Sequence, residues 1–210
     1  EIMSSDWSSD VCSSDLLVKE TDLAPLPDPA PQLLPSTEQD LVETISHLAL
    51  LNQIPYLVDL LQIVEPLLES LSAAPFHGTQ HLYADVGLPH KVPFTSLGQS
   101  LSALLDLLAT AMANPGSLIL ADDLDATIHH SFLAHFWAVT AAALADHSCQ
   151  LVATTQRYEC LQTAYQIVCN EREEDLFLHR LDLDLEGDVV AHTFDAPSLG
   201  DALKSFLEVR

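Results

Sequence analysis

The chain has 210 residues, 48% of them hydrophobic, which is enough for one sizeable packed domain or two small ones. This composition excludes collagen-like, disordered and disulfide-scaffold proteins. There are 31 Asp and Glu against 7 Lys and Arg, and the formal net charge of −24 argues against a basic surface for nucleic acid. Chemistry that needs several fixed positive charges on a phosphate must take them from another chain or another segment.

The cysteines and the apolar stretches predict in which cellular compartment the protein lies. Cys12, Cys149, Cys160 and Cys169 form no C-x-x-C pair, and no signal-peptide pattern precedes them. We therefore expect a reduced, cytoplasmic protein whose thiols are structural. The apolar stretches fall short of the ~18 residues that a membrane helix needs, so no membrane contact is expected.

The first two segments of the chain have unusual sequences. Residues 1–16 repeat Ser-Ser-Asp three times and closely resemble translated sequencing-adapter read-through, so we expect them to be non-native. Residues 17–37 carry five prolines, which remove backbone donors and disfavour helix, and this predicts an extended, proline-rich linker. On this reading the native chain begins near Leu17, and upstream sequence is missing.

Residues 38–75 are predicted to be a helical insertion. Ser36 and Thr37 provide a capping-box-like start, after which leucine and isoleucine recur at helical spacing. A second helix is predicted over 56–72, with Pro66 as a possible kink.

Residues 76–210 are predicted to form an α/β lobe with parallel strands, flanking helices and a C-terminal β-hairpin. A strand, a helix and a further strand over about 117–154 describe a right-handed βαβ crossover. In chain order, the expected elements are a strand over 81–86, a helix over 97–113, a strand over 117–121, a helix over 131–145, a strand over 150–154, a helix over 158–169, a hairpin over 176–194 and a helix over 197–206.

A carboxylate pair ends the apolar strand 117–121. Asp122 and Asp123 stand where the ligands of a nucleotide-binding parallel sheet lie, beyond the carboxyl ends of the strands. There, one aspartate can hold Mg²⁺ through water and the next carboxylate can orient an attacking water. On the pattern alone, two acids at a strand end are more often a helix cap with a solvated neighbour.

Four stretches of sequence together resemble one family. They are VPFTSLGQ at 92–99, the acidic strand end followed by Ile128 and His129, VATTQRYEC at 152–160, and LEVR at 207–210. In this order and spacing they resemble ABC-type AAA ATPases related to RecF and to the overcoming-lysogenization-defect proteins. The resemblance covers roughly 80–210 and implies the C-terminal half of a P-loop NTPase, with ATP and Mg²⁺ as cofactors.

The resemblance assigns roles to the acidic strand end and to the following strand. Asp122 matches the Walker B aspartate on the metal side, and Asp123 stands where the family places a catalytic glutamate, one methylene longer. Gln156 stands where the family normally has a histidine that senses the γ-phosphate, and a glutamine can donate a hydrogen bond but cannot carry a proton. Asp125 and His129 match an acidic residue and a histidine that follow the pair, whereas His130 is expected to be exposed.

The signature loop and its nucleotide are implied in the same way. Ser96, Leu97 and Gly98 match the start of the loop that caps the γ-phosphate of a nucleotide on the partner subunit, which implies a homodimer. Gln99 follows where the family usually has an acidic residue, and the family's nearby arginine is absent. Thr95 or Ser96 can also simply cap the following helix.

The sequence contains no G-x-x-x-x-G-K-[ST], so the phosphate-binding Walker A half is expected upstream of it. Two hypotheses follow. The chain is the C-terminal portion of an ATPase that is inactive alone, or it is a non-catalytic acidic interaction module, a pseudo-ATPase.

Overall fold

The structure is a computed structural model that describes residues 31–35, 37–171, 176–183 and 187–204. The expected adapter-derived segment 1–16 and most of the expected linker 17–37 lie outside these residues. Within the described residues, no helix combines the length and the apolar character needed to cross a bilayer.

A parallel three-stranded sheet lies at the centre of the fold. It has the order β1-β5-β6, and its strands are β1 (Gln32–Leu33), β5 (Leu118–Ala121) and β6 (Gln150–Ala153). The short helix η2 (His130–Phe132) and helix α4 (Leu133–Asp146) connect β5 to β6, which confirms the predicted strand, helix and parallel strand. The two residues of β1 fall within the expected linker, where the sequence analysis placed no strand.

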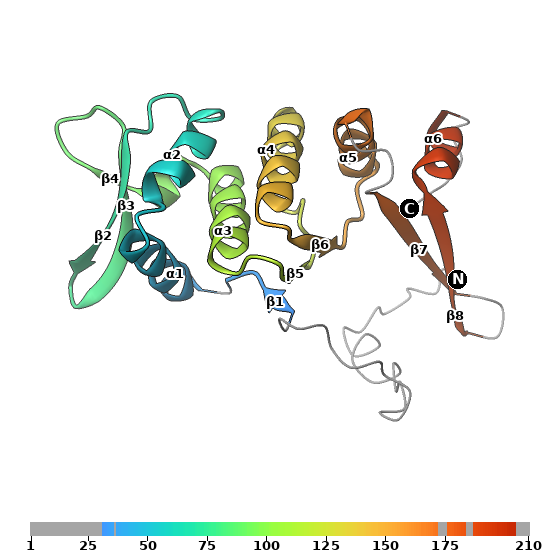
Figure 1. Cartoon of the computed structure of the whole chain (residues 1–210), viewed down its shortest axis with the longest axis horizontal. Coiled ribbons are helices and arrows are strands. Elements are labelled where there is room, and N and C mark those ends of the chain that lie inside the picture. The colour runs from blue at the N-terminus through green and yellow to red at the C-terminus, as the bar shows by residue number, and fades with distance from the viewer. Residues whose placement is uncertain (1–30, 36, 172–175, 184–186, 205–210) are drawn as a thin grey trace, which may run out of the picture.

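An antiparallel sheet and two helices follow β1 and form one end of the molecule (Figure 1). The helices are α1 (Glu38–Leu50) and α2 (Ile54–Gln62), and the strands are β2 (Ser70–Phe76), β3 (Thr79–Asp85) and β4 (Val92–Pro93). Helix α1 begins after Thr37, whose side chain accepts a hydrogen bond from the backbone N–H of Asp40.

The predicted helix over 56–72 is wrong in its second half. Helix α2 ends at Gln62, and residues 70–76 form a strand that pairs with β3 instead. Pro66 gives the physical reason, because proline disfavours helical geometry at the residue before it and removes a backbone donor. Residues 38–75 are therefore helical only as far as Gln62.

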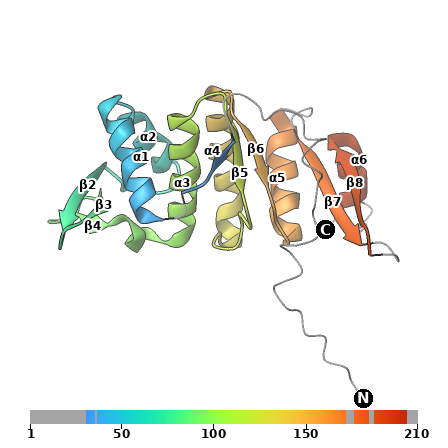
Figure 2. The same ribbon diagram turned by 90° about the horizontal axis from the view of Figure 1, so that it is seen from below.

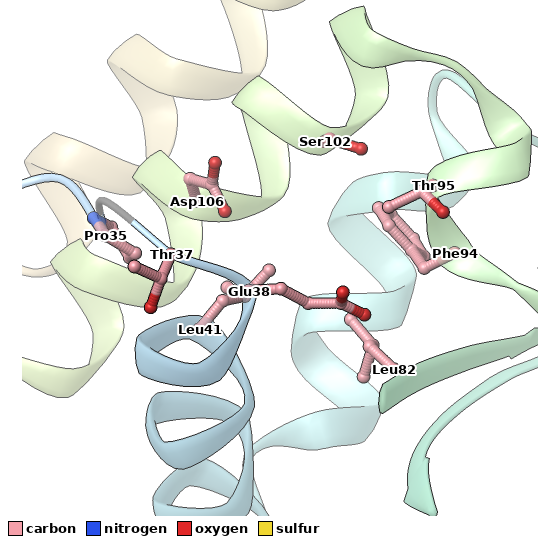
Figure 3. Close-up of a pocket in the computed structure, with 9 residues that line it drawn as sticks. All are labelled: Pro35, Thr37, Glu38, Leu41, Leu82, Phe94, Thr95, Ser102 and Asp106. Atoms are coloured by element: carbon pink, nitrogen blue, oxygen red, sulfur yellow. The ribbon is translucent and has the colours of Figure 1, made fainter. Parts of the chain in front are cut away.

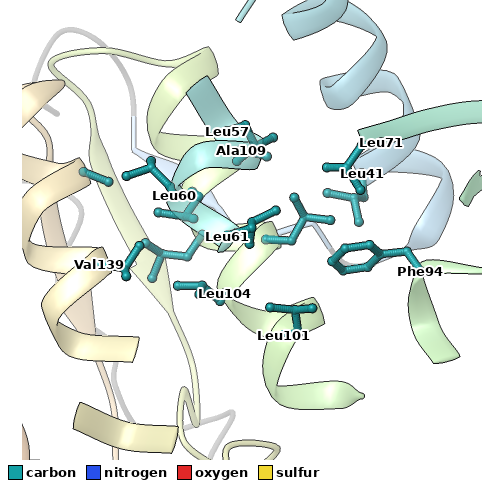
Figure 4. Packing of buried hydrophobic residues seen from close by; sticks show 14 of the residues in the cluster. Leu41, Leu57, Leu60, Leu61, Leu71, Phe94, Leu101, Leu104, Ala109 and Val139 are labelled. Carbon is teal, nitrogen blue, oxygen red and sulfur yellow. The ribbon is translucent and has the colours of Figure 1, made fainter. Parts of the chain in front are cut away.

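Helix α3 (Gln99–Ala113) carries the main hydrophobic core and follows the short helix η1 (Phe94–Leu97). The side chains of Leu104, Leu105 and Leu108 are fully buried, and Figure 4 shows leucines of α2 and α3 packed together with Phe94 and Val139 nearby. The predicted helix over 97–113 is confirmed, apart from its first two residues.

The C-terminal end is a helix, a hairpin and a second helix, as predicted. The elements are α5 (Tyr158–Glu171), β7 (Phe177–Leu183), β8 (Val189–Asp195) and α6 (Ala196–Lys204). The two strands pair antiparallel, and Leu199 and Leu203 of α6 pack with Leu161 of α5 in a second small core.

Among the described residues, no helix covers one face of the parallel sheet. Helices α3, α4 and α5 all lie on the same side of it (Figures 1 and 2). Leu33, Leu120 and Val152 occupy one row across the opposite face, where Leu33 is 76% exposed and Val152 is 55% exposed. In the described part of the chain, β6 is also an edge strand that pairs only with β5. Strand β5, expected to be buried on both faces, is thus fully buried on one, although parallel sheets are normally covered on both.

The core assignment predicts the effect of truncating one leucine. Replacing Leu104, which is 0% exposed, by Ala should lower the free energy of unfolding by about 2–5 kcal/mol, because a cavity remains where the side chain packed. Leu50→Ala, at a side chain that is 82% exposed, is the matched control and should change it little. Urea unfolding followed by circular dichroism measures both, and equal effects would contradict the assignment.

Candidate functional site

The carboxyl ends of β5 and β6 bring one predicted site residue into contact with a threonine. The Thr154 hydroxyl donates to Oδ1 of Asp122 at 2.5 Å and accepts from the backbone N–H of Asp123 at 2.7 Å. Backbone hydrogen bonds from Leu124 to Thr154 and from Thr154 to Ala121 continue the pairing past the strands. Thr154 therefore fixes the orientation of the Asp122 carboxylate and the start of the loop that follows β5.

Asp123 has a backbone conformation that few residues adopt. Its φ is +46°, in the left-handed region, where aspartate and asparagine are tolerated better than most non-glycine residues. Asp122 and Asp123 are both exposed, and so is Gln156, two residues beyond Thr154. The three predicted residues thus lie at the same edge of the sheet, but no hydrogen bond among the described residues joins Gln156 to either carboxylate.

A buried carboxylate lies beneath this edge. The Asp125 side chain is 1% exposed, and the Arg157 Nε lies 3.3 Å from its Oδ2. The Arg157 guanidinium also donates to the carbonyl oxygens of Asp125 at 2.8 Å and Ile128 at 3.1 Å. Arg157 therefore neutralises the buried charge and holds the loop after β5 against the start of α5.

The predicted signature loop, Ser96 to Gln99, joins η1 to α3. Gly98 has φ +112°, a conformation that side-chain-bearing residues rarely adopt, and no side chain caps the N-terminus of α3. Ser96, Gly98 and Gln99 are exposed, whereas Leu97 is half-buried. Uncapped N–H groups at the start of a 15-residue helix favour an anion there.

Ser100 connects this loop region to the loop after β5. Its hydroxyl donates to the carbonyl of Thr127 at 3.1 Å and accepts from the backbone N–H of His129 at 3.1 Å. Among the described residues, no hydrogen bond or ion pair joins residues 96–99 directly to Asp122 or Asp123. Among the described residues, the predicted signature loop and the acidic pair are thus linked by side-chain hydrogen bonds only through Ser100, which contacts the loop after β5 at Thr127 and His129.

The residues at this edge fit Mg²⁺ bound together with phosphates. Mg²⁺ keeps several waters and needs only one or two carboxylates when substrate phosphates supply further oxygens. Asp122 offers its second carboxylate oxygen to solvent, since Thr154 contacts the first. In the described chain, no group of three or more His, Cys, Asp or Glu side chains could hold a metal ion.

The thiols that the structure describes support a packing role. Cys160 is 1% exposed, and burial raises the pKa of its thiol, which disfavours the reactive thiolate. The Cys149 thiol donates to the carbonyl of Asn114 at 3.4 Å. Cys12 lies outside the described residues.

Three contact residues were missing from the predicted site: Ser100, Thr154 and Arg157. For Thr154 a signal existed, because it is the first residue after the strand parallel to the one that ends in Asp122. Arg157 was one of only seven cations, and its proximity to a buried aspartate 32 positions earlier follows from the tertiary fold alone. The hydrogen bonds of Ser100 likewise cross from α3 to a distant loop.

Comparison with known proteins gives structural matches only. No protein-family model and no curated protein matches the sequence. An SMC ATPase structure, from work on ATP-driven dimerization and DNA-stimulated activation of these enzymes, matches 78% of this chain and 96% of its own, with TM-score 0.52 and 12% identity. The fold is therefore similar to that of SMC ATPase heads.

A second SMC head structure shows the same similarity of fold. The Smc head bound to the C-winged helix domain of ScpA matches 81% of this chain, again with TM-score 0.52 and 12% identity. This chain spans about half, 54%, of that head. The similarity confirms the expected α/β class, with a parallel sheet and flanking helices, while the relationship to ABC-type AAA ATPases, RecF and overcoming-lysogenization-defect proteins stays a prediction.

The buried ion pair predicts the result of removing its cation. Arg157→Met should lower the free energy of unfolding by about 3 kcal/mol, because Asp125 is left as an unpaired buried charge. In an Asp125→Asn background the same change should cost less, since only the carbonyl hydrogen bonds remain to be lost. Lys91→Met, at an exposed lysine, should stay within about 0.5 kcal/mol. Urea titration measures all four variants, and equal losses in both backgrounds would refute the pairing.

Proposed function

We propose that this chain is the carboxylate-bearing part of an ATPase that binds and hydrolyses MgATP between two subunits. The observation that carries the proposal is the carboxylate of Asp122 held by Thr154 where two parallel strands end. This is the edge at which open α/β sheets bind their ligands. With ATP and Mg²⁺ present, the free oxygen of Asp122 would hold the metal through water, and the metal would neutralise charge on the phosphates.

The start of α3 supports a phosphate-facing role for the loop of Ser96, Leu97, Gly98 and Gln99. The uncapped N-terminus of α3 provides backbone N–H donors without using a cation. Because these residues have no direct contact with Asp122 in the same chain, we propose that they meet a nucleotide held by a second subunit. The ATP-driven dimerization described for the SMC neighbour is consistent with that arrangement.

In the described chain, the uncovered face and the unpaired edge of the parallel sheet support the proposal that a further segment carries the phosphate-binding half of the site. A further strand beside β6 and a helix over Leu33 and Val152 would give the sheet the double cover usual for parallel strands. We propose that the segment with the phosphate-binding loop fills this place. Its lysine would supply the positive charge that this acidic chain lacks.

A non-catalytic role is the second candidate, and two residues favour it. Asp123 is one methylene shorter than glutamate and has left-handed backbone geometry, and Gln156 cannot exchange a proton. Moving a general base by about 1 Å can cost on the order of a hundredfold in rate. A copy with both features could bind nucleotide and dock a partner without turning over.

Nucleotide affinity of the isolated chain tests the proposed division of the site. We expect no submicromolar ATP binding with Mg²⁺ by calorimetry, because no phosphate-binding loop is present. Submicromolar affinity would overturn the claim that another segment holds the phosphates.

Turnover by the protein expressed from the complete gene tests the roles of the two aspartates. Asp122→Ala should reduce ATP hydrolysis to background, and Asp123→Glu should raise it by up to about a hundredfold by restoring the reach of the base. Asp201→Ala, at an exposed aspartate of α6, is the control and should leave turnover unchanged. Binding without turnover in both the parent and Asp123→Glu would favour the non-catalytic module, and a gene without a phosphate-binding loop would refute the ATPase.

A further inference from the structure

A cavity of about 210 Å³ lies between the start of α1, strand β3, η1 and α3 (Figure 3). Its lining shares no residue with the candidate functional site. The apolar part of its wall includes Leu41, Leu82 and Phe94, all of which are buried. The volume corresponds to roughly seven water molecules, which is room for a short chain of heavy atoms.

The polar part of the wall contains an unpaired carboxylate. Among the described residues, the Asp106 side chain has no hydrogen-bond or ion-pair partner, although it is half-buried. Burial raises its pKa to about 6, so at pH 7.5 the group is mainly ionised despite its surroundings. Figure 3 shows Asp106 and Ser102 on the side of α3 that looks toward Glu38 and Thr95. A charge held in this way lacks the counter-ion that such groups normally have.

The polar groups around Asp106 indicate which kind of cation would fit the cavity. Glu38 adds a second carboxylate, which has His81 at 3.2 Å, and the hydroxyls of Thr37, Thr95 and Ser102 can accept hydrogen bonds. No lysine or arginine is among the described residues that line the cavity. An ammonium group has three donors and no acceptor, and its alkyl stem matches the apolar floor.

We propose that this cavity binds a primary alkylammonium group, held by Asp106 at its charged end and by Leu41, Leu82 and Phe94 along its stem. The group belongs either to a free small amine or to a lysine side chain of another polypeptide. An occupant would lie against Thr95, which directly precedes Ser96. Binding does not depend on the proposed ATPase function.

The test is titration of the ¹⁵N-labelled chain at pH 7.5 and 150 mM NaCl, followed by NMR. The two probes are n-butylammonium and the peptide Gly-Gly-Lys-Gly-Gly. We expect saturable shifts of the Thr37, Thr95 and Ser102 amides with at least one probe, and the tighter probe identifies the source of the amine. Asp106→Asn should weaken binding at least about tenfold, because it removes a charge-assisted hydrogen bond while keeping the shape.

Three controls keep the result specific. Asp59→Asn removes an exposed carboxylate of α2 outside the cavity and should leave the affinity unchanged. n-Butanol, which has the same stem without the charge, should bind at least about tenfold more weakly. The spectrum of Asp106→Asn away from the cavity should match the parent, which verifies folding. Shifts spread over the whole acidic surface, or equal affinity for the parent and Asp106→Asn, would overturn the proposal.

Discussion

The parallel pairing of β5 with β6 is the constraint on which the candidate site depends. Its register places Ala121 opposite Ala153, so the next residue of each strand, Asp122 and Thr154, emerges at the same edge. One hydroxyl then contacts both the carboxylate and the following amide. A shift of register by one residue would turn these side chains to the opposite face and separate them.

The loops that follow β5 and β6 are also held together by a side chain, that of Arg157, which is one of the few cations of the chain. Arg157 lies in the loop after β6, and its guanidinium donates hydrogen bonds to the carbonyl oxygens of Asp125 and Ile128 in the loop after β5. One of the seven lysine and arginine side chains of the protein thus has a structural role. The guanidinium is suited to this role because its fork can serve a carboxylate and two carbonyls together.

Much of the fold was predictable, because local patterns and tertiary contacts agree there. The apolar run that ends in Asp122 and the long amphipathic stretch ending at Ala113 both formed the expected elements. The prediction failed at 63–76, where leucines at helical spacing continue past Gln62. Pro66 disfavours a continued helix there, and residues 70–76 pair with β3 as a strand. The sequence did not indicate β1, whose two residues are a strand only because β5 lies beside them.

The candidate site was predictable to a smaller extent, for the same reason. The acidic pair stands out because it ends an apolar strand, whereas Ser100 and Arg157 acquire their contacts from residues about 30 positions away. Such contacts depend on how helices α3 and α5 lie against the loop after β5. The left-handed backbone of Asp123 likewise results from a turn that the sequence does not mark with glycine.

In the part of the chain that the structure describes, one edge of β6 is unpaired, and this affects how copies of the chain behave toward one another. An unpaired strand edge beside an apolar face is a template for pairing with another chain, and it promotes aggregation when left uncovered. The net charge of −24 opposes such encounters by mutual repulsion. At 0.15 M ionic strength the Debye length is only about 8 Å, so added salt weakens this protection. The acidity of the chain therefore affects its solubility: charge repulsion keeps the exposed edge of β6 apart from other copies, most effectively in dilute buffer.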